Sequence, residues 1–423
     1  MTPEIRTAPE IHTVPSEEMV PWLKTMRTSL QADPGNISDS QLDYWREVWD
    51  PERIWGAYDG GRCVGTLRTF DTDLGVPTGP GSAAPIPTDA LTQVGVAATH
   101  RRQGLLRRML TASLTAAKER GEAVSLLRAA EWGIYGRFGY WPAAPAADYT
   151  IRTGNPSLTV RPPAQPVEVV QVDPSELLDP ARSVLDRLSR QAPGQIRRPP
   201  AMWKRTLRLH NPASLREPVC VVARSASGEV DGYAMWTGQD GDWYHDPVHH
   251  VQARIDEILA VTPDAERALW NYLVHIDLVR SLTLEAYPVD LPLEWLLSDG
   301  RDARRTWSGD NDWLRILDLP ATLCARRYAT TDRLVLDVVD EDGGFAAGRF
   351  VLDGGPEHAE CTPTNLSADL TLSQRALAGS YLGGYPVRAQ QQAGLLDEET
   401  PGAARRLQAM LVTERAPWNA TPF

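Results

Sequence analysis

The feature that most constrains the fold of this 423-residue chain is a short basic turn between a strand and a helix. Residues 90–99 are rich in apolar and β-branched side chains, which favours a strand. Residues 102–120 have apolar side chains at helical spacing, and Gly121 marks the end of that helix. The turn itself, residues 101–104 (RRQG), puts two arginines at a helix N-terminus, where they oppose the helix dipole. The arrangement therefore predicts an anionic ligand at this turn.

A helix N-terminus offers unpaired backbone N–H groups and a positive dipole end, which together suit a pyrophosphate. Gly104 removes a side chain where a phosphate must approach the backbone, and Arg101 and Arg102 add fixed positive charge. The alternative, an ordinary amphipathic helix with a basic start, leaves that charge without a purpose. The predicted cofactor-binding residues are Val94, Gly95, Val96, Arg101, Arg102, Gln103, Gly104, Leu105, Leu106, Arg107, Ala130 and Glu131.

Two stretches of this region resemble a known family. Residues 101–106 look like the acetyl-CoA loop of the GNAT acetyltransferase superfamily, R/Q-x-x-G-x-G/A, with Leu106 in place of the usual small last residue. Residues 131–140 (EWGIYGRFGY), together with residues 99–107 (THRRQGLLR), closely resemble the Eis (enhanced intracellular survival) family. The resemblance implies an α+β fold, with two GNAT-like mixed-sheet domains followed by a sterol-carrier-protein-like α/β domain. It also implies acetyl-CoA as co-substrate.

The order of expected elements divides the chain into three blocks, residues 1–148, 149–310 and 311–423. In the first block, Ser38 and Gln41 form a capping box that opens a helix, and residues 53–70 form a hairpin. The Pro- and Gly-rich residues 75–87 are expected to be a loop. The strands and helices of the second block follow the same order as those of the first, which indicates a diverged internal repeat.

The second block differs from the first at the basic turn. Where the first has residues 99–104 (THRRQG), the second has residues 262–267 (TPDAER). Pro263 with Asp264 and Glu266 makes a stable helix start, but it puts carboxylates where a pyrophosphate would lie and removes the glycine. We therefore expect that the second domain does not bind CoA.

The resemblance to the Eis family also implies the catalytic groups. It assigns Tyr135 as the general acid that protonates the departing CoA thiolate, and Tyr140 is the second candidate. It assigns the C-terminal carboxylate, here on Phe423, as the general base that deprotonates the amine. The aromatic residues of the last ten positions (ERAPWNATPF) predict that this tail is docked. If the terminus is not the base, a water held by Glu131 or His100 is the alternative.

Charge and composition bear on the acceptor. Lys and Arg number 43 against 55 Asp and Glu, a formal charge of −12, which argues against nucleic-acid binding through bulk charge. An acidic chain attracts cations, so we expect an aminoglycoside-like or polyamine acceptor. Trp22 and Trp45, on the two N-terminal helices, are expected to line the acceptor groove. The four cysteines lie far apart, without a Cys-x-x-Cys pair, and predict neither a metal site nor a disulfide.

Two other functions stay open from the sequence. One is acetylation of a protein or peptide lysine, and the other is a non-catalytic lipid or ligand carrier that uses the third domain. No run approaches 18 apolar residues, so a membrane span is not expected, and the N-terminal sequence does not resemble a signal peptide, which favours the cytoplasm. The family resemblance implies a homo-hexamer.

Overall fold

One large sheet runs through the first two domains of the computed structural model, which describes residues 8–35, 37–209, 216–239 and 251–423. Its strand order is β1-β2-β3-β4-β5-β12-β6-β11-β10-β9-β8-β7. The strands of its first half are β1 (Glu10–Thr13), β2 (Ile54–Asp59), β3 (Arg62–Gly79), β4 (Ser82–Val96), β5 (Val124–Arg128) and β6 (Trp141–Arg152). Those of its second half are β7 (Val167–Val172), β8 (Val219–Ser225), β9 (Val230–Gly238), β10 (Val251–Ala260), β11 (Val279–Tyr287) and β12 (Ala303–Ile316).

The two halves of the sheet exchange a strand. β12 from the second half lies between β5 and β6 and pairs antiparallel with both. β6 from the first half in turn pairs antiparallel with β11. Each half is thus completed by a strand of the other, and β12 runs across the predicted boundary at residues 310 and 311. The exchange ties the two domains together along hydrogen-bonded backbone rather than through side chains alone.

The expectation of a loop at residues 75–87 is wrong. β3 and β4 continue as one long hairpin, in which Gly75 pairs with Pro85 and Pro77 with Ala83, around a tight turn at residues 79–82. Proline and glycine are poor strand formers, but distant segments supply the bonds that the local sequence lacks. The N–H of Gly75 donates to the Gln195 carbonyl at 2.8 Å, and the N–H of Arg327 donates to the Pro77 carbonyl at 2.8 Å.

Helices cover the first half of the sheet as the amphipathic patterns predict. Adjacent residues of a strand serve opposite faces: Ala90 and Leu126 pack in the core shared with the third domain, while Leu91 and Leu127 pack against α3. Ser38 forms the predicted capping box at the start of α2. The helical segments are η1 (Ser16–Glu18), α1 (Met19–Ser29), α2 (Asp39–Val48), η2 (Pro51–Arg53), η3 (Ala98–His100), α3 (Leu105–Glu119), α4 (Trp132–Tyr135) and η4 (Gly136–Phe138).

The second domain repeats this plan with its own helices. Thr262 caps α7 by accepting the N–H of Ala265, with Pro263 at the first helical position, as the sequence predicts. The helices are α5 (Pro174–Ser189), α6 (Pro200–Thr206), α7 (Pro263–Val274), α8 (Leu293–Leu296) and η5 (Gly300–Asp302).

The third domain has a sheet of five strands in the order β15-β14-β13-β16-β17. The strands are β13 (Asp332–Val339), β14 (Gly348–Gly354), β15 (Ala359–Pro363), β16 (Leu370–Ser373) and β17 (Leu396–Glu398). The helices are α9 (Leu319–Ala325), α10 (Gln374–Tyr381), α11 (Val387–Gln392) and α12 (Ala403–Leu411). Because α10 packs on β6 and β12, this domain closes the face of the first sheet half that α3 leaves open.

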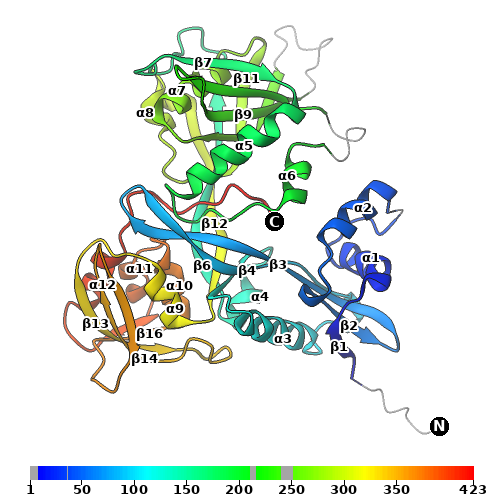
Figure 1. The fold of residues 1–423 in the computed structure, drawn as a ribbon, viewed down its shortest axis with the longest axis vertical. Coiled ribbons are helices and arrows are strands. Elements are labelled where there is room, and N and C mark those ends of the chain that lie inside the picture. Colours follow the sequence, from blue (N-terminus) through cyan, green and yellow to red (C-terminus); the bar gives the residue numbers. More distant parts are fainter. Residues whose placement is uncertain (1–7, 36, 210–215, 240–250) are drawn as a thin grey trace.

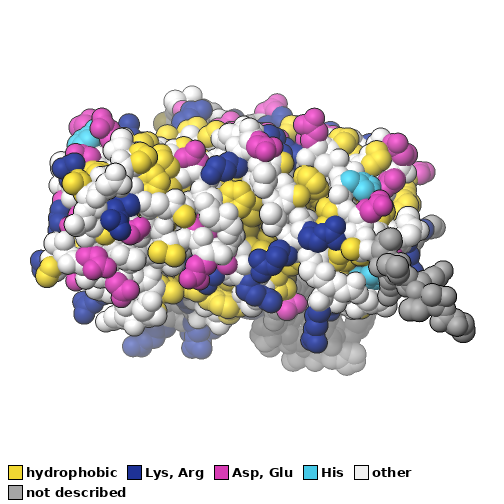
Figure 2. All heavy atoms as spheres, turned by 90° about the horizontal axis from the view of Figure 1, so that it is seen from below, with side chains coloured by type: hydrophobic (Ala, Val, Ile, Leu, Met, Phe, Trp, Pro, Cys, Tyr) yellow, Lys and Arg dark blue, Asp and Glu magenta, His cyan; other side chains and the backbone are white. Residues whose placement is uncertain are grey.

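The chain ends in the middle of the molecule. After α12, the last segment leaves the third domain and runs to a point between α6 and β3, so that all three domains meet around the C-terminus (Figure 1). The face seen from below shows acidic and basic side chains interspersed among apolar ones (Figure 2). Among the described helices, none is long and apolar enough to cross a membrane.

Candidate active site

A gap between β4 and β5 forms the first part of the site. The two strands pair in parallel over Thr88–Leu91 and Val124–Leu127, and beyond these residues β4 leaves β5. The departure coincides with Gln93, whose φ of +49° belongs to the left-handed region, and with a register shift between β3 and β4. The N–H of Ala97 bonds to β3, at the Val64 carbonyl. Because alternate residues direct backbone groups to opposite sides, Val94 and Val96 direct theirs toward the gap.

The basic turn lies at the end of that gap. Residues 101–104 are all exposed, and both Arg102 (φ +63°) and Gly104 (φ +76°) have left-handed backbone conformations. This is why α3 begins at Leu105, three residues later than the sequence suggests. No side chain caps the helix, and a Cβ on Gly104 would meet no atom within 4 Å. The first-turn N–H groups of a 15-residue helix therefore have no side-chain cap and follow a turn with two exposed arginines, as an anion site requires.

The flanking residues give this turn its shape. His100 uses both ring nitrogens, with Asp59 Oδ2 at 3.0 Å from Nε2 and Thr99 Oγ1 at 2.8 Å from Nδ1. It therefore anchors the turn and is poorly placed to hold a catalytic water. Arg107 places its guanidinium over the ring of Phe138, with 5.2 Å between the guanidinium carbon and the ring centroid.

Tyr135 and Tyr140 lie in different environments. Tyr135, at the end of α4, keeps 9% of its surface exposed, and no hydrogen bond to its hydroxyl is found among the described residues. Burial, with a smaller effect of the Glu131 charge, raises the pKa of Tyr135 to about 12, so it carries its proton at neutral pH. Tyr140 is fully buried, its hydroxyl is 2.7 Å from Ser125 Oγ, and Ser125 donates to Asp89. Of the two, Tyr135 alone has surface from which to reach a ligand.

The short helix that carries Tyr135 begins at the exposed end of β5. Ala130 and Glu131 are exposed there, next to the gap. Trp132 follows with 56% of its surface exposed, and its ring packs edge-on against Trp313 at a centroid distance of 4.9 Å. Trp132 is thus fixed on one side and open on the other, at the mouth of the candidate site.

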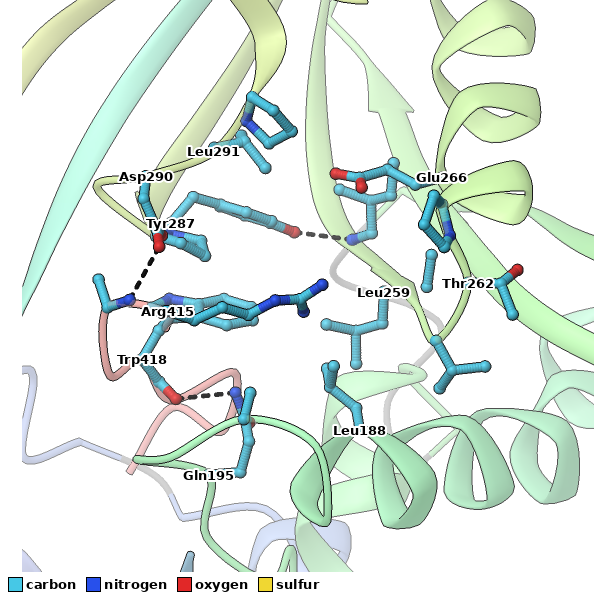
Figure 3. A pocket seen from close by; sticks show the side chains of 18 of the residues that line it. Leu188, Gln195, Leu259, Thr262, Glu266, Tyr287, Asp290, Leu291, Arg415 and Trp418 are labelled. Atoms are coloured by element: carbon cyan, nitrogen blue, oxygen red, sulfur yellow. Dashed lines mark hydrogen bonds between the residues drawn. The ribbon is translucent and has the colours of Figure 1, made fainter. Parts of the chain in front are cut away.

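The C-terminal tail is held by the second domain. The second domain has a cavity of about 240 Å³ between the ends of β10 and β11, at the start of α7, and residues of the tail line part of it (Figure 3). Trp418 packs on Tyr287 at 5.3 Å and donates its indole N–H to the Ala286 carbonyl at 2.7 Å. The Asp290 carboxylate accepts the N–H of Ala416 at 2.8 Å. This is the docking that the aromatic residues of the tail predict.

The cavity occupies the position in the second domain that the gap between β4 and β5 occupies in the first. β10 and β11 also pair in parallel over four residues, ending at Arg254 and Thr283, and then separate. Figure 3 shows Thr262 and Glu266 on one side of the cavity, Trp418 and Arg415 across from them, and the Arg415 side chain extended into it. The tail therefore lies in the second domain's counterpart of the first domain's gap.

Beyond Trp418, two buried side chains guide the last residues. Gln195 donates to the Trp418 carbonyl at 2.8 Å and accepts the N–H of Ala420 at 3.1 Å. Arg198, which is paired with Glu257, donates to the carbonyl of Ala420 at 3.1 Å and to Thr421 Oγ1 at 3.3 Å. Residues 418–421 are thereby held on both sides as they leave the second domain.

The last residue reaches the first domain. The Phe423 ring contacts that of Phe70 on β3, edge to face at 5.7 Å, and lies under the guanidinium of Arg128 at 5.5 Å. Arg128, the last residue of β5, donates to the Asn419 carbonyl at 3.0 Å and pairs with Asp312 at 2.9 Å. Arg205 of α6 donates to the Pro422 carbonyl at 3.2 Å. The structure thus brings the predicted catalytic terminus to the end of β5, two residues before Ala130.

A second cavity, of about 260 Å³, is separated from the terminal residue by the Phe70 side chain. It lies between the end of α2, the middle of β3 and the start of α6. Phe70 lines it and also contacts Phe423. Its charged lining residues are Glu47, Asp50, Arg53, Arg68 and Asp71.

The expectation for Trp22 needs correction. Trp22 is fully buried, its indole N–H donates to the Trp55 carbonyl, and its ring supports Trp45 and Trp49 from behind. Trp45 is 8% exposed and packs against the guanidinium of Arg68. The aromatic residues that line the cavity are Trp49 and Phe70. Helical spacing identified the apolar face of these helices, but it did not show which tryptophan lies at the edge of that face.

Several residues of the site could not have been found from the sequence. Four of them contact the tail but are separated from their tail partners by 222 to 353 positions in the sequence: Phe70, Arg128, Gln195 and Arg198. No local motif marks these residues. The four cysteines are free, and the described residues contain no group of His, Cys, Asp and Glu that could hold a metal ion.

Comparison with known proteins agrees with this architecture. Two acetyltransferase (GNAT) domain models match residues 10–143 and 194–316, and a sterol carrier protein domain model matches residues 319–420. The two GNAT matches confirm the internal repeat. The first of them implies acetyl-CoA as the co-substrate, and the residues at the gap and at the start of α3 fit it.

Curated relatives cover nearly the whole chain. An uncharacterized N-acetyltransferase of Streptomyces griseus is 37% identical over 97% of this chain and 98% of its own. N-acetyltransferase Eis of Mycobacterium bovis is 33% identical over 85% of each chain. The crystal structure of Eis1 from Mycobacterium abscessus has a TM-score of 0.83, with 28% identity over 98% of this chain and 100% of that one. The chain is an N-acetyltransferase that belongs to the Eis family of GNAT enzymes.

Proposed function

We propose that this enzyme moves the acetyl group of acetyl-CoA to a primary amine held in the cavity between α2, β3 and α6. The amine attacks the thioester directly while both substrates are bound, so no covalent enzyme intermediate forms. The observation that carries the proposal is the docked C-terminus, because it places Phe423 at the end of β5 and beside this cavity.

The first domain would hold acetyl-CoA. The backbone groups of Val94 and the N–H of Val96 face the gap, where an extended amide-bearing arm can pair with them as a strand would. The Val96 carbonyl accepts a hydrogen bond from Arg101 Nε at 3.4 Å, and the arm would have to displace it to pair there. The pyrophosphate would lie on the N–H groups at the start of α3, with Arg101 and Arg102 in the preceding turn to supply positive charge. Gly104 leaves the close approach open.

The two proton transfers fall to Tyr135 and to the terminal carboxylate. Tyr135 is protonated at neutral pH, so its hydroxyl can donate to the CoA sulfur as the C–S bond breaks and negative charge builds up there. If the proton passes to sulfur, CoA leaves as the thiol and Tyr135 regains a proton from water. The Phe423 carboxylate takes a proton from the attacking amine, directly or through one water. The hydrogen bonds from Gln195 and Arg198 to residues 418–421 limit where that carboxylate can lie.

The acceptor is a cationic amine. Glu47, Asp50 and Asp71 line the cavity, where an ammonium group would share them with their basic partners Lys204, Arg53 and Arg197. The net charge of −12 attracts cations from a distance. The ring faces of Trp49 and Phe70 would flank an alkylammonium group. An aminoglycoside-like molecule or a polyamine fits this description. Assembly into a homo-hexamer and a cytoplasmic location stay predictions.

The test combines a panel of amines with a chain extended after its last residue. We expect acetyl-CoA turnover with at least one of an aminoglycoside, spermidine, L-lysine and a lysine-containing peptide. Adding Gly-Ser-Gly after Phe423 should lower kcat by about 10²- to 10⁴-fold, because the carboxylate moves out of reach. The affinity for CoA should not change. The control is the same extension at the N-terminus, and full activity of the C-terminally extended enzyme would show that the terminus is not the base.

The carrier alternative requires an apolar cavity enclosed by the third domain. The cavity of about 440 Å³ at this domain lies instead at its border with the β3–β4 turn. A cavity that lies wholly within the third domain, lined among others by Leu372, Leu377 and Leu396, has a volume of about 10 Å³. That space is too small for a sterol or an acyl chain. Acetylation of peptide lysines is decided by the panel above.

A further inference from the structure

Arg68 is a buried cation on the wall of the acceptor cavity. It lies on β3, two residues before Phe70, and keeps 4% of its surface exposed. Its guanidinium packs between two rings, with centroid distances of 5.6 Å to Trp45 and 5.7 Å to Phe70. Both rings hold the group in place, and neither neutralises its charge.

The hydrogen bonds of Arg68 leave it incompletely satisfied. One terminal nitrogen donates to Gln93 Oε1 at 3.2 Å and the other to the Val48 carbonyl at 3.4 Å, while the buried Nε has no partner. No carboxylate of the described residues forms an ion pair with it. Burial lowers the pKa of Arg68 to about 10, which still leaves it charged at neutral pH.

Other buried arginines of the described chain show how unusual this is. Arg53, which lines the same cavity, pairs with Asp89 and Glu122 at 3.3 and 2.5 Å. Arg198 pairs with Glu257 at 2.6 Å. Arg326 lacks a carboxylate, but each of its three nitrogens donates to a backbone carbonyl. Arg68 alone among these four has neither a counter-ion nor a full set of acceptors.

A buried charge of this kind costs free energy unless an opposite charge joins it. The cavity beside Arg68 is open to a small molecule, and the carboxylates of Glu47, Asp50 and Asp71 line other parts of it. Each of these carboxylates already has a basic partner, Glu47 with Lys204, Asp50 with Arg53 and Asp71 with Arg197. An ammonium group would share a carboxylate with such a partner, whereas an anion would find in Arg68 a cation without a counter-ion. A polyamine can interact with the carboxylates, but it leaves Arg68 without a counter-ion.

We propose that Arg68 binds a carboxylate of the acceptor, so that the natural acceptor is an amino acid or a related amine that also carries an acid group. This rests on the proposed function, because it concerns the acceptor of that same reaction. Gln93 positions Arg68 through its side-chain oxygen, and it lies at the point where β4 leaves β5. The acceptor carboxylate would thus bind next to the gap proposed for acetyl-CoA.

The test uses L-lysine and L-lysinamide as acceptors. They have nearly the same shape, but lysinamide lacks the carboxylate and carries one more net positive charge. Attraction by the bulk charge of −12 favours lysinamide, whereas a site at Arg68 favours lysine. We expect kcat/KM to be about 10-fold or more higher for lysine in the wild type, since hydrogen bonds between charged groups discriminate at least that strongly.

The decisive variant is Arg68→Met, which keeps the length and removes the charge. It should bring the ratio of the two kcat/KM values to about one without changing KM for acetyl-CoA, and Arg68→Lys should keep part of the preference. The matched control is Arg46→Met, since Arg46 is an exposed arginine on α2. A melting curve of each variant checks folding, and replacing an unpaired buried charge by an apolar side chain favours the folded state.

Three results would count against the proposal. If the wild-type enzyme acetylates lysinamide and lysine with equal kcat/KM, Arg68 does not bind the acceptor carboxylate, but the proposed acetyl transfer to amines is not contradicted. If Arg68→Met lowers turnover of both acceptors equally, Arg68 supports Phe70 or the terminal residue instead. If no amine of any kind is acetylated, the proposed function fails and this inference fails with it.

Discussion

The two acetyltransferase domains of this chain share a plan but differ at the turn where a cofactor would bind. In each, two parallel strands pair over four residues and then separate, and a helix begins at the opening. In the first domain that helix has no side-chain cap and follows two arginines and a glycine. In the second it has a threonine cap, a proline and two carboxylates in its first turn. The two helices thus begin in the same place in the fold, but the first start suits a bound anion and the second stabilises the helix itself.

The openings also differ in what occupies them. The first is bordered by the half-buried Val94 and Val96 and by exposed residues of the basic turn and of the end of β5, and the second holds Trp418 and its neighbours from the C-terminal tail. A four-residue helix follows the last strand of each pair, and it ends in Tyr135 in the first domain and in Leu296 in the second. The second domain has neither the turn nor the acid, but it anchors the segment that ends in the proposed base. A duplicated domain can thus exchange a binding role for a positioning role with few changes.

The largest effect should come from the proposed general acid, Tyr135, whose counterpart in the second domain is Leu296. Tyr135→Phe removes one hydroxyl and should lower kcat by about 10²- to 10⁴-fold, with little change in CoA affinity. The control is Tyr140→Phe, which should cost about 1 kcal/mol of stability through the lost bond to Ser125 and leave kcat nearly unchanged. Steady-state kinetics and melting curves separate the two. Near-normal turnover of Tyr135→Phe would rule out this residue as the acid.

The second-largest effect should come from emptying the second opening. Trp418→Ala should cost about 3–5 kcal/mol of stability, because the side chain is 8% exposed and packed. It should also lower kcat at least about 10-fold, because the Phe423 carboxylate would no longer be held in position, and a displacement of about 1 Å is enough to slow proton transfer. Trp418→Phe should restore part of both.

The comparison residue for this experiment is Trp295, which lies in the same domain with 75% of its surface exposed. Trp295→Ala should change neither quantity, as expected for an exposed side chain. If Trp418→Ala enzyme remains folded and turns over normally, the second domain does not position the terminus.

A third prediction concerns the number of cofactor sites. Calorimetry should find one CoA per chain, and Arg102→Glu should weaken binding by about 10-fold or more by placing a negative charge beside the pyrophosphate. Arg388→Glu, the same change on an exposed helix of the third domain, should have no effect. A stoichiometry of two would contradict the division of roles between the two domains.

A fourth prediction concerns stability against pH in the first domain. Burial, with the nearby charge of Glu122, raises the pKa of Asp89 to about 7, above the reference of about 3.9 for the unfolded chain. Between these two values the folded state binds more protons than the unfolded state, so stability falls as pH rises from about 4 to about 7. Asp89→Asn should flatten that slope in melting curves taken from pH 4 to 8. A slope that is unchanged would assign the dependence to another group.

The sequence by itself determined the features that depend on neighbours a few residues away. The capping box of Ser38 and Gln41, the cap of Thr262 and the strand-turn-helix at residues 90–120 all follow from spacing and from local hydrogen bonds. The order of the expected elements was enough to indicate the repeat, which the two GNAT domain matches confirm, and comparison of the turns predicted which half binds CoA. Local sequence also predicted that the aromatic tail is docked, although not where.

Only the tertiary structure decided the features whose partners are far away in the chain. Residues 75–87 form strands because Gln195 and Arg327 meet their backbone. β6 and β12 change places between the two sheet halves, and no strand pattern encodes which edge a strand will join. Trp22 is buried behind Trp45, and the unpaired charge of Arg68 emerges only when every neighbour is in place. Contacts between distant segments depend on how whole domains pack, and residue spacing along the chain does not record that packing.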